Sequence, residues 1–134
     1  MKILPRNTNQ PERRALVVEA DTGTRDICRA ALECLGFSVN AVDSGVAAVS
    51  AARENTPDVV VFDTQLRDVG GAELLAWFRG NPSLRDVPMI AISALAEREG
   101  AESIRKHVAG LVRKPVSRAA LKDSVRALAI ARHA

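Results

Sequence analysis

Aromatic side chains are scarce in this sequence. They make up 3% of the 134 residues, and there is no Tyr. A module that binds nucleic acid by stacking bases on aromatic rings is therefore not expected. The lysines and arginines are scattered rather than banded, and the formal net charge is only +3. Direct binding to nucleic acid is not expected from this charge pattern either.

Long apolar runs and cysteines are also few. No run approaches the roughly 18 apolar residues of a membrane-spanning helix, so we expect no membrane span. The two cysteines are Cys28 and Cys34. On one helix they would lie roughly 9 Å apart along the axis, too far for a disulfide bond. We therefore expect a reducing compartment and a cytoplasmic location.

Short apolar runs recur along the chain, and each is followed by a stretch with helical spacing. The predicted strands are 15–18, 37–42, 59–62, 88–92 and 111–112. Runs that are apolar throughout are typical of strands covered on both faces. The alternation predicts an α/β fold, a doubly wound five-stranded parallel sheet with helices on both faces. We expect residues 1–14 to form a flexible basic tail and residues 15–131 to form one domain.

Capping residues and glycine mark the helix ends. Thr22 or Thr24 is predicted to cap a first helix that Gly36 ends, and Ser44 is predicted to cap the second. The later helices are predicted near 71–80 and at 95–107, and a last helix that carries Leu121, Val125 and Leu128 is followed by residues 131–134. Helical spacing predicts buried faces at Ile27, Ala30, Ala31 and Cys34, at Val46, Val49 and Ala52, and at Leu121, Val125 and Leu128.

Polar residues follow the predicted strands. In a doubly wound sheet, ligands bind at the carboxyl ends of the strands. The residues at these ends are Glu19, Ala20 and Asp21, then Asp63, then Ser93 and Ala94, then Lys114 and Pro115. Carboxylates that face a lysine and a hydroxyl suit a dication and a phosphoryl group. Asp21 taken alone is equally well explained as a helix cap.

These residues, with their spacing, resemble the receiver domain of two-component response regulators. The matching stretches are LVVEAD at 16–21 followed by Arg25, PDVVVFD at 57–63, GAELL at 71–75, PMIAISA at 88–94 and VRKP at 112–115. The resemblance spans about 15–129. It implies a CheY-like (flavodoxin-like) fold with strand order 2-1-3-4-5. It also implies a signalling domain rather than an enzyme, with at most self-phosphorylation and dephosphorylation chemistry.

The resemblance assigns a role to each strand-end residue. Asp63 would accept a phosphoryl group from a histidine kinase or phosphotransfer protein, Lys114 would pair with the phosphoryl oxygens, and Ser93 would donate a hydrogen bond to them. Ala94 would leave space for the group, and Lys114–Pro115 would be a cis peptide. A magnesium site would be formed by Glu19, Asp63, the backbone carbonyl of Gln65 and, weakly, Asp21.

Three positions depart from the family pattern. Ala20 stands where the family places a metal-binding acid, so we expect magnesium binding weakened at least ten- to a hundred-fold. Leu111 replaces a common aromatic switch residue, and Arg67 replaces a proline, which predicts a looser loop beside Asp63. These departures leave open a pseudo-receiver, a binding module that works without phosphorylation.

The resemblance also implies a docking surface for a downstream protein target, on the fourth predicted helix, fifth strand and fifth helix. Its candidate residues are Glu97, Arg98, Glu102, Arg105, Arg113 and Arg118. A homodimer through this face is a further expectation. A flavin carrier of the flavodoxin type is a third alternative, indicated only by Thr22-Gly23-Thr24 in the loop after the first strand. The basic residues Lys2, Arg6, Arg13 and Arg14 could contact an acidic partner.

Overall fold

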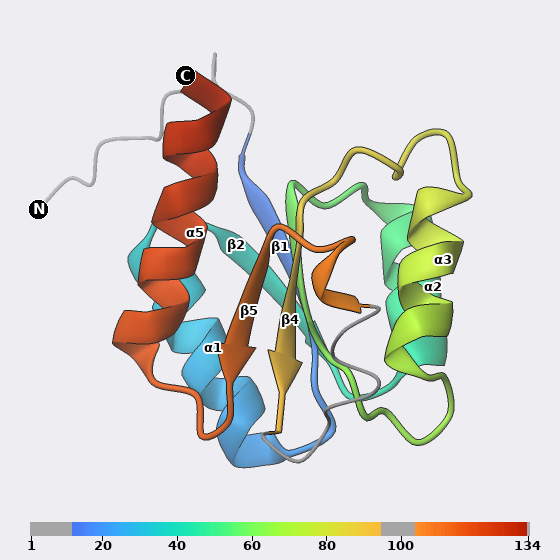
Figure 1. Cartoon of the computed structure of the whole chain (residues 1–134), viewed down its shortest axis with the longest axis horizontal. Coiled ribbons are helices and arrows are strands. Elements are labelled where there is room, and N and C mark those ends of the chain that lie inside the picture. Colours follow the sequence, from blue (N-terminus) through green and yellow to red (C-terminus); the bar gives the residue numbers. More distant parts are fainter. Residues whose placement is uncertain (1–11, 95–103, 134) are drawn as a thin grey trace, which may run out of the picture.

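A single parallel sheet organises the molecule (Figure 1). The computed structural model describes residues 12–94 and 104–133. Its strands are β1 (Arg14–Val18), β2 (Ser38–Val42), β3 (Val59–Asp63), β4 (Met89–Ser93) and β5 (Gly110–Arg113). All neighbours pair in parallel, in the order β2-β1-β3-β4-β5. This confirms the predicted fold class and strand order.

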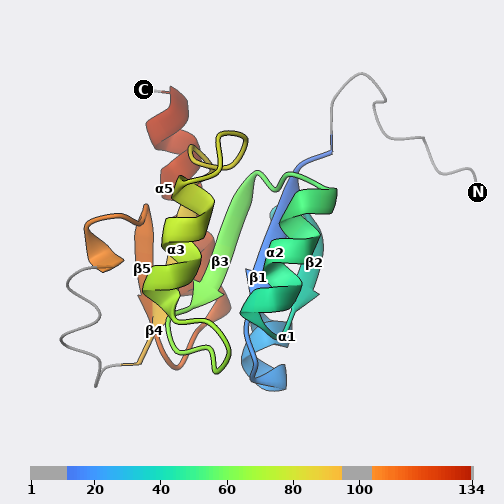
Figure 2. The same cartoon turned by 90° about the vertical axis from the view of Figure 1, so that its right-hand side faces the viewer.

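Helices cover both faces of the sheet. They are α1 (Thr22–Cys34), α2 (Gly45–Glu54), α3 (Gly71–Arg79) and α5 (Arg118–His133). Helices α1 and α5 lie on one face, and α2 and α3 lie on the other (Figures 1 and 2). The fourth predicted helix falls largely outside the described residues, as do residues 1–11. No helix among the described residues has the length and apolarity to cross a membrane.

The core has two layers because successive strand residues point to opposite faces. Leu16 and Val18 of β1 pack in the layer with α2 and α3, whereas Ala15 and Val17 pack in the layer with α1 and α5. Every residue of β3 and β4 is buried. A central strand covered on both faces has no solvent-facing position, so its apolar run is continuous up to the final Asp63.

Two of the predicted helix signals are confirmed, and one is wrong. Gly36 ends α1 with φ 93°, a left-handed conformation that favours glycine. Ser44 caps α2 by accepting a hydrogen bond from the Ala47 N–H. The cap of α1 is Asp21 rather than Thr22 or Thr24, because the Asp21 carboxylate accepts from both the N–H and the hydroxyl of Thr24.

Two predicted buried faces need correction. In α1 the buried residues are Cys28, Ala31 and Leu32, and the predicted Cys34 is exposed. In α2 the predicted Ala52 is buried and Val49 is partly buried against the core, but the predicted Val46 is 66% exposed, and the other buried positions are the small residues Gly45, Ala48 and Ala51. Helical spacing allows neighbouring registers, and the close approach of α2 to the sheet selects the small side chains. The Leu121 and Val125 face of α5 is buried as predicted.

Candidate functional site

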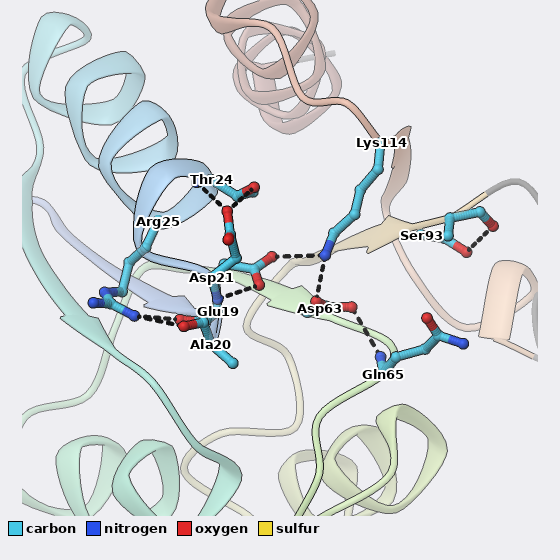
Figure 3. Close-up of polar contacts among 10 residues, drawn as sticks. Glu19, Ala20, Asp21, Thr24, Arg25, Asp63, Gln65, Ser93 and Lys114 are labelled. Atoms are coloured by element: carbon cyan, nitrogen blue, oxygen red, sulfur yellow. Dashed lines mark hydrogen bonds and ion pairs between the residues drawn. The ribbon is translucent and has the colours of Figure 1, made fainter.

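Glu19, Asp63 and Lys114 form a carboxylate–lysine cluster at the carboxyl ends of the strands (Figure 3). Asp63 ends β3, Glu19 follows β1, and Lys114 follows β5. The Lys114 Nζ atom lies 2.6 Å from Asp63 Oδ2 and 3.3 Å from Glu19 Oε1. Strand β4 separates β3 from β5, so the lysine chain bridges two strand spacings, roughly 10 Å. A long cationic side chain is what this crossing requires.

Both oxygens of the Asp63 carboxylate have a partner. Oδ2 accepts from Lys114, and Oδ1 accepts a 2.9 Å hydrogen bond from the Gln65 N–H. The residue is only 4% exposed. The backbone at the start of the β3–α3 loop therefore holds the Asp63 carboxylate on one side. Lys114 holds it on the other side.

Glu19 is the most buried acid of the cluster, at 1% exposure. Its Oε2 accepts from the Asp21 N–H at 3.0 Å, and its Oε1 has the Lys114 ion pair but no hydrogen bond. Burial is the main reason that the pKa of Glu19 is raised, and the neighbouring Asp63 charge raises it further. The Asp21 N–H and the Lys114 charge oppose this shift without cancelling it.

The pKa of Lys114 is also raised. Burial of the ammonium works against its charge, but the hydrogen bond and attraction of Asp63, followed by those of Glu19, outweigh it. Two carboxylates and one ammonium leave the cluster with a formal negative charge when both acids are ionised. The cluster therefore attracts a further cation.

The donors present fit a magnesium ion that keeps several waters. Within the described residues, no three His, Cys, Asp or Glu side chains form a group that could hold a metal. By the resemblance, the donors would be the Glu19 and Asp63 carboxylates and the backbone carbonyl of Gln65; of these, one Glu19 oxygen lacks a hydrogen bond. Magnesium accepts a site with one or two carboxylates completed by water and phosphate oxygens.

Neither Ala20 nor Asp21 adds a carboxylate to the cluster. Asp21 is committed to Thr24 as the cap of α1, and the hydrogen bonds from the Thr24 N–H and hydroxyl lower its pKa. The Arg25 guanidinium donates to the carbonyls of Glu19 (2.8 Å) and Ala20 (3.2 Å). Thr22-Gly23-Thr24 forms the first turn of α1, not a loop before it, which removes the basis for a flavin site.

Ser93 lies at the same edge, at the end of β4. It is 2% exposed, and its hydroxyl donates to the Ala94 carbonyl at 3.2 Å. The Lys114 N–H donates to the Ser93 carbonyl, which ties the ends of β4 and β5 together. The Lys114–Pro115 peptide is cis, as the resemblance implied.

The sequence reasoning missed Asp68. This loop residue is not part of the carboxylate–lysine cluster. Its carboxylate accepts hydrogen bonds from the first two N–H groups of α2, those of Gly45 (3.0 Å) and Val46 (2.9 Å). Asp68 lies more than twenty residues from Gly45 and Val46 in the sequence, so no local pattern could indicate this contact. The loop is anchored at Asp68 even though Arg67 takes the place of the family proline.

Comparison with known proteins agrees with this geometry. Residues 15–126 match the family model described as "Response regulator receiver domain". The polar-differentiation response regulator DivK of Brucella ovis is 32% identical over 103 residues, which are 76% of this chain and 84% of DivK.

Solved structures agree as well. A sensor protein from Polaromonas sp. JS666 is 27% identical with a TM-score of 0.79, covering 92% of this chain and 100% of that one. The receiver domain of a Pseudomonas aeruginosa sensor histidine kinase, solved with magnesium coordinated in its active-site cleft, is 26% identical with a TM-score of 0.77, covering 87% and 97%. The chain therefore belongs to the response regulator receiver family, whose members are phosphorylatable signalling domains rather than enzymes.

Proposed function

We propose that Asp63 is the phosphoacceptor of this receiver. A carboxylate oxygen of Asp63 bonds to the phosphorus of a phosphohistidine donor as the P–N bond breaks. The electron pair of that bond returns to the imidazole nitrogen, and the product is an acyl phosphate. A receiver domain implies a histidine kinase partner; for this chain the immediate donor is such a kinase or a phosphotransfer protein.

One observation carries the proposal: the 2.6 Å contact between the buried Asp63 carboxylate and the Lys114 ammonium. This contact supports a role for Lys114 in supplying positive charge to the oxygens of a phosphoryl group on Asp63. Ser93 supplies a hydroxyl from the adjacent strand end once it turns from the Ala94 carbonyl. Ala94 leaves room for the group.

Receiver domains bind magnesium in this site, and here we propose that the binding is weakened. Glu19, Asp63 and the Gln65 carbonyl would hold the ion, and Asp21 contributes little because it caps α1. When bound, magnesium supplies charge that stabilises the phosphoryl oxygens. The methyl group of Ala20 removes one ligand, and even outer-shell losses cost about ten- to a hundred-fold in affinity.

We place the downstream docking surface on β5, the segment before it and the start of α5. Arg105, Arg113 and Arg118 are all exposed there. Arg105 and Arg113 line a surface hollow of about 340 Å³ together with Leu111. This positive surface suits a protein partner with acidic side chains. Glu97, Arg98 and Glu102 lie outside the described residues.

Mass spectrometry after incubation with a small phosphodonor, with and without magnesium, tests the acceptor. We expect an adduct of one phosphoryl group on the wild type that is lost in Asp63→Asn. Asp26→Asn, which changes an exposed acid on α1, is the matched control and should keep the adduct. Ala20→Asp should increase labelling at low magnesium. Absence of an adduct under every condition, in Ala20→Asp as well, would favour the pseudo-receiver.

A further inference from the structure

The loop after β3 is fastened at its tip to the start of α2. Asp68 Oδ1 accepts from the Gly45 N–H at 3.0 Å, and Oδ2 accepts from the Val46 N–H at 2.9 Å. The Ser44 hydroxyl oxygen accepts a hydrogen bond from the next N–H group of the helix, that of Ala47. Two caps from different segments thus share one helix end, and only the Asp68 cap comes from the loop. Helix N-termini favour such negatively charged partners.

Packing reinforces this contact. A methyl group on Gly45 would lie 2.7 Å from the Val69 Cβ atom, so the loop touches the helix backbone directly. At the base of the loop, the Gly71 N–H donates to the Thr64 carbonyl at 3.2 Å. A methyl group on Gly71 would lie 2.8 Å from the Thr64 Cα atom. The loop is therefore closed at its base and held at its tip.

This loop carries the group that fixes the proposed phosphoacceptor. The Gln65 N–H donates to Asp63 Oδ1, three residues before Asp68. On the other side, the segment before α2 is tied to the cluster, because the Glu19 N–H donates to the Val42 carbonyl at the end of β2. The Asp68 cap thus connects the two segments that flank the Glu19 and Asp63 carboxylates.

We propose that Asp68 is a positioning residue for phosphoryl transfer: by fastening the loop to α2, it holds the Gln65 backbone against Asp63. The inference rests on the proposed role of Asp63. Arg67 gives this loop none of the rigidity that a proline ring would add, so the Asp68 cap is a main restraint on the tip of the loop. The two backbone N–H groups also lower the pKa of Asp68, which keeps the carboxylate ionised as the pH falls toward the acidic range.

Asp68→Ala and Ser44→Ala form a matched pair of variants. Each removes a side-chain cap from the same end of α2, but only Asp68→Ala releases the loop. We expect a larger loss of stability in Asp68→Ala, which removes two hydrogen bonds to a charged group, than in Ser44→Ala, which removes one. The rate of labelling by a small phosphodonor should fall at least tenfold in Asp68→Ala and less than twofold in Ser44→Ala. Equal rates in the two variants would overturn the proposal.

A rescue variant separates loop restraint from charge. Asp68→Ala combined with Arg67→Pro restores rigidity to the loop without restoring the carboxylate, because proline fixes φ. We expect this double variant to recover most of the wild-type labelling rate. If it stays as slow as Asp68→Ala while remaining folded, Asp68 acts through its charge and the positioning role is wrong.

Amide hydrogen exchange gives a readout that does not depend on phosphorylation. We expect the Gln65 N–H to exchange at least tenfold faster in Asp68→Ala than in Ser44→Ala, measured at equal global stability. If the wild type is never labelled but the two variants differ in this way, Asp63 is rejected as the acceptor. Asp68 is then still the residue that holds Gln65. Unchanged exchange at Gln65 would reject the positioning role directly.

Discussion

Glu19 is a buried acid whose ionisation opposes folding. Burial and the Asp63 charge raise its pKa above the ordinary value of 4.5. The stability that the neutral acid provides is fully present below that value and is lost as the pH rises through the folded pKa. Glu19→Gln should therefore stabilise the metal-free protein at pH 7. Urea unfolding followed by the fluorescence of Trp77, the sole tryptophan, measures this.

The pH dependence distinguishes this explanation from a general gain in packing. The advantage of Glu19→Gln should shrink toward zero near pH 4, where the wild-type acid becomes neutral as well. Glu54→Gln changes an exposed acid at the end of α2 and should leave stability unchanged at both values of pH. Loss of stability in Glu19→Gln at pH 7 would contradict this explanation. It would mean that the ion pair with Lys114 stabilises the ionised Glu19 by more than burial destabilises it.

The two cysteines should differ sharply in reactivity. Burial, with a smaller effect of the Glu19 charge, raises the pKa of the Cys28 thiol to about 12, so it carries almost no thiolate near pH 8. Cys34 is exposed at the end of α1. A thiol-reactive chromophore should therefore modify one equivalent in the native protein and two after unfolding. Native Cys34→Ala should not react, and rapid reaction of Cys28 would contradict its burial.

At the scale of elements, the strands are more predictable than the helix faces. A strand such as β3, covered on both sides, must be apolar along its whole length, so its identity depends little on neighbouring elements. Helix α1 could bury either of two adjacent registers, and only its packing against the sheet and α5 selects Cys28 over Cys34. Sequence spacing alone does not contain that choice.

Helix α3 is linked to two later segments by one side chain. The Arg79 guanidinium donates to the carbonyls of Arg85 (2.7 Å), Val87 (2.8 Å) and His107 (3.2 Å). Arg79→Ala leaves these carbonyls without that donor and should destabilise the protein by about 1–3 kcal/mol. Chemical denaturation provides the measurement. Arg85→Ala is the control, because only the backbone of that exposed residue takes part; equal losses would refute the role of Arg79.

For the whole molecule, the site was predictable where the topology alone brings residues together. The carboxyl ends of parallel strands meet at one edge, so Asp63 and Lys114 could be placed together before any coordinates were known. Asp68 could not be placed, because its partners on α2 depend on how a loop and a helix from separate units pack. The role of Asp21 was also open, since a strand-end acid serves equally as a ligand or as a cap.

The magnesium dependence of global stability measures how far Ala20 weakens the site. An ion that binds only the folded state stabilises it according to its affinity, and each tenfold in affinity adds about 1.4 kcal/mol once the ion is in excess. Ala20→Asp adds a third carboxylate beside Glu19 and Asp63. It should lower the melting temperature without magnesium and raise it above the wild type at millimolar magnesium.

Ala20→Asp is thus expected to have a lower melting temperature than the wild type without magnesium and a higher one with it. A general change in stability would shift both values in the same direction. Repulsion among three carboxylates dominates without the ion, and ligation dominates with it. Ala127→Asp adds the same charge at an exposed position in the C-terminal half of α5, which runs away from the strand ends that carry the cluster (Figure 1). This variant should retain the wild-type magnesium response. If Ala20→Asp responds to magnesium no more than Ala127→Asp does, the missing acid does not limit metal binding. The cause of any weak labelling would then lie elsewhere than at position 20.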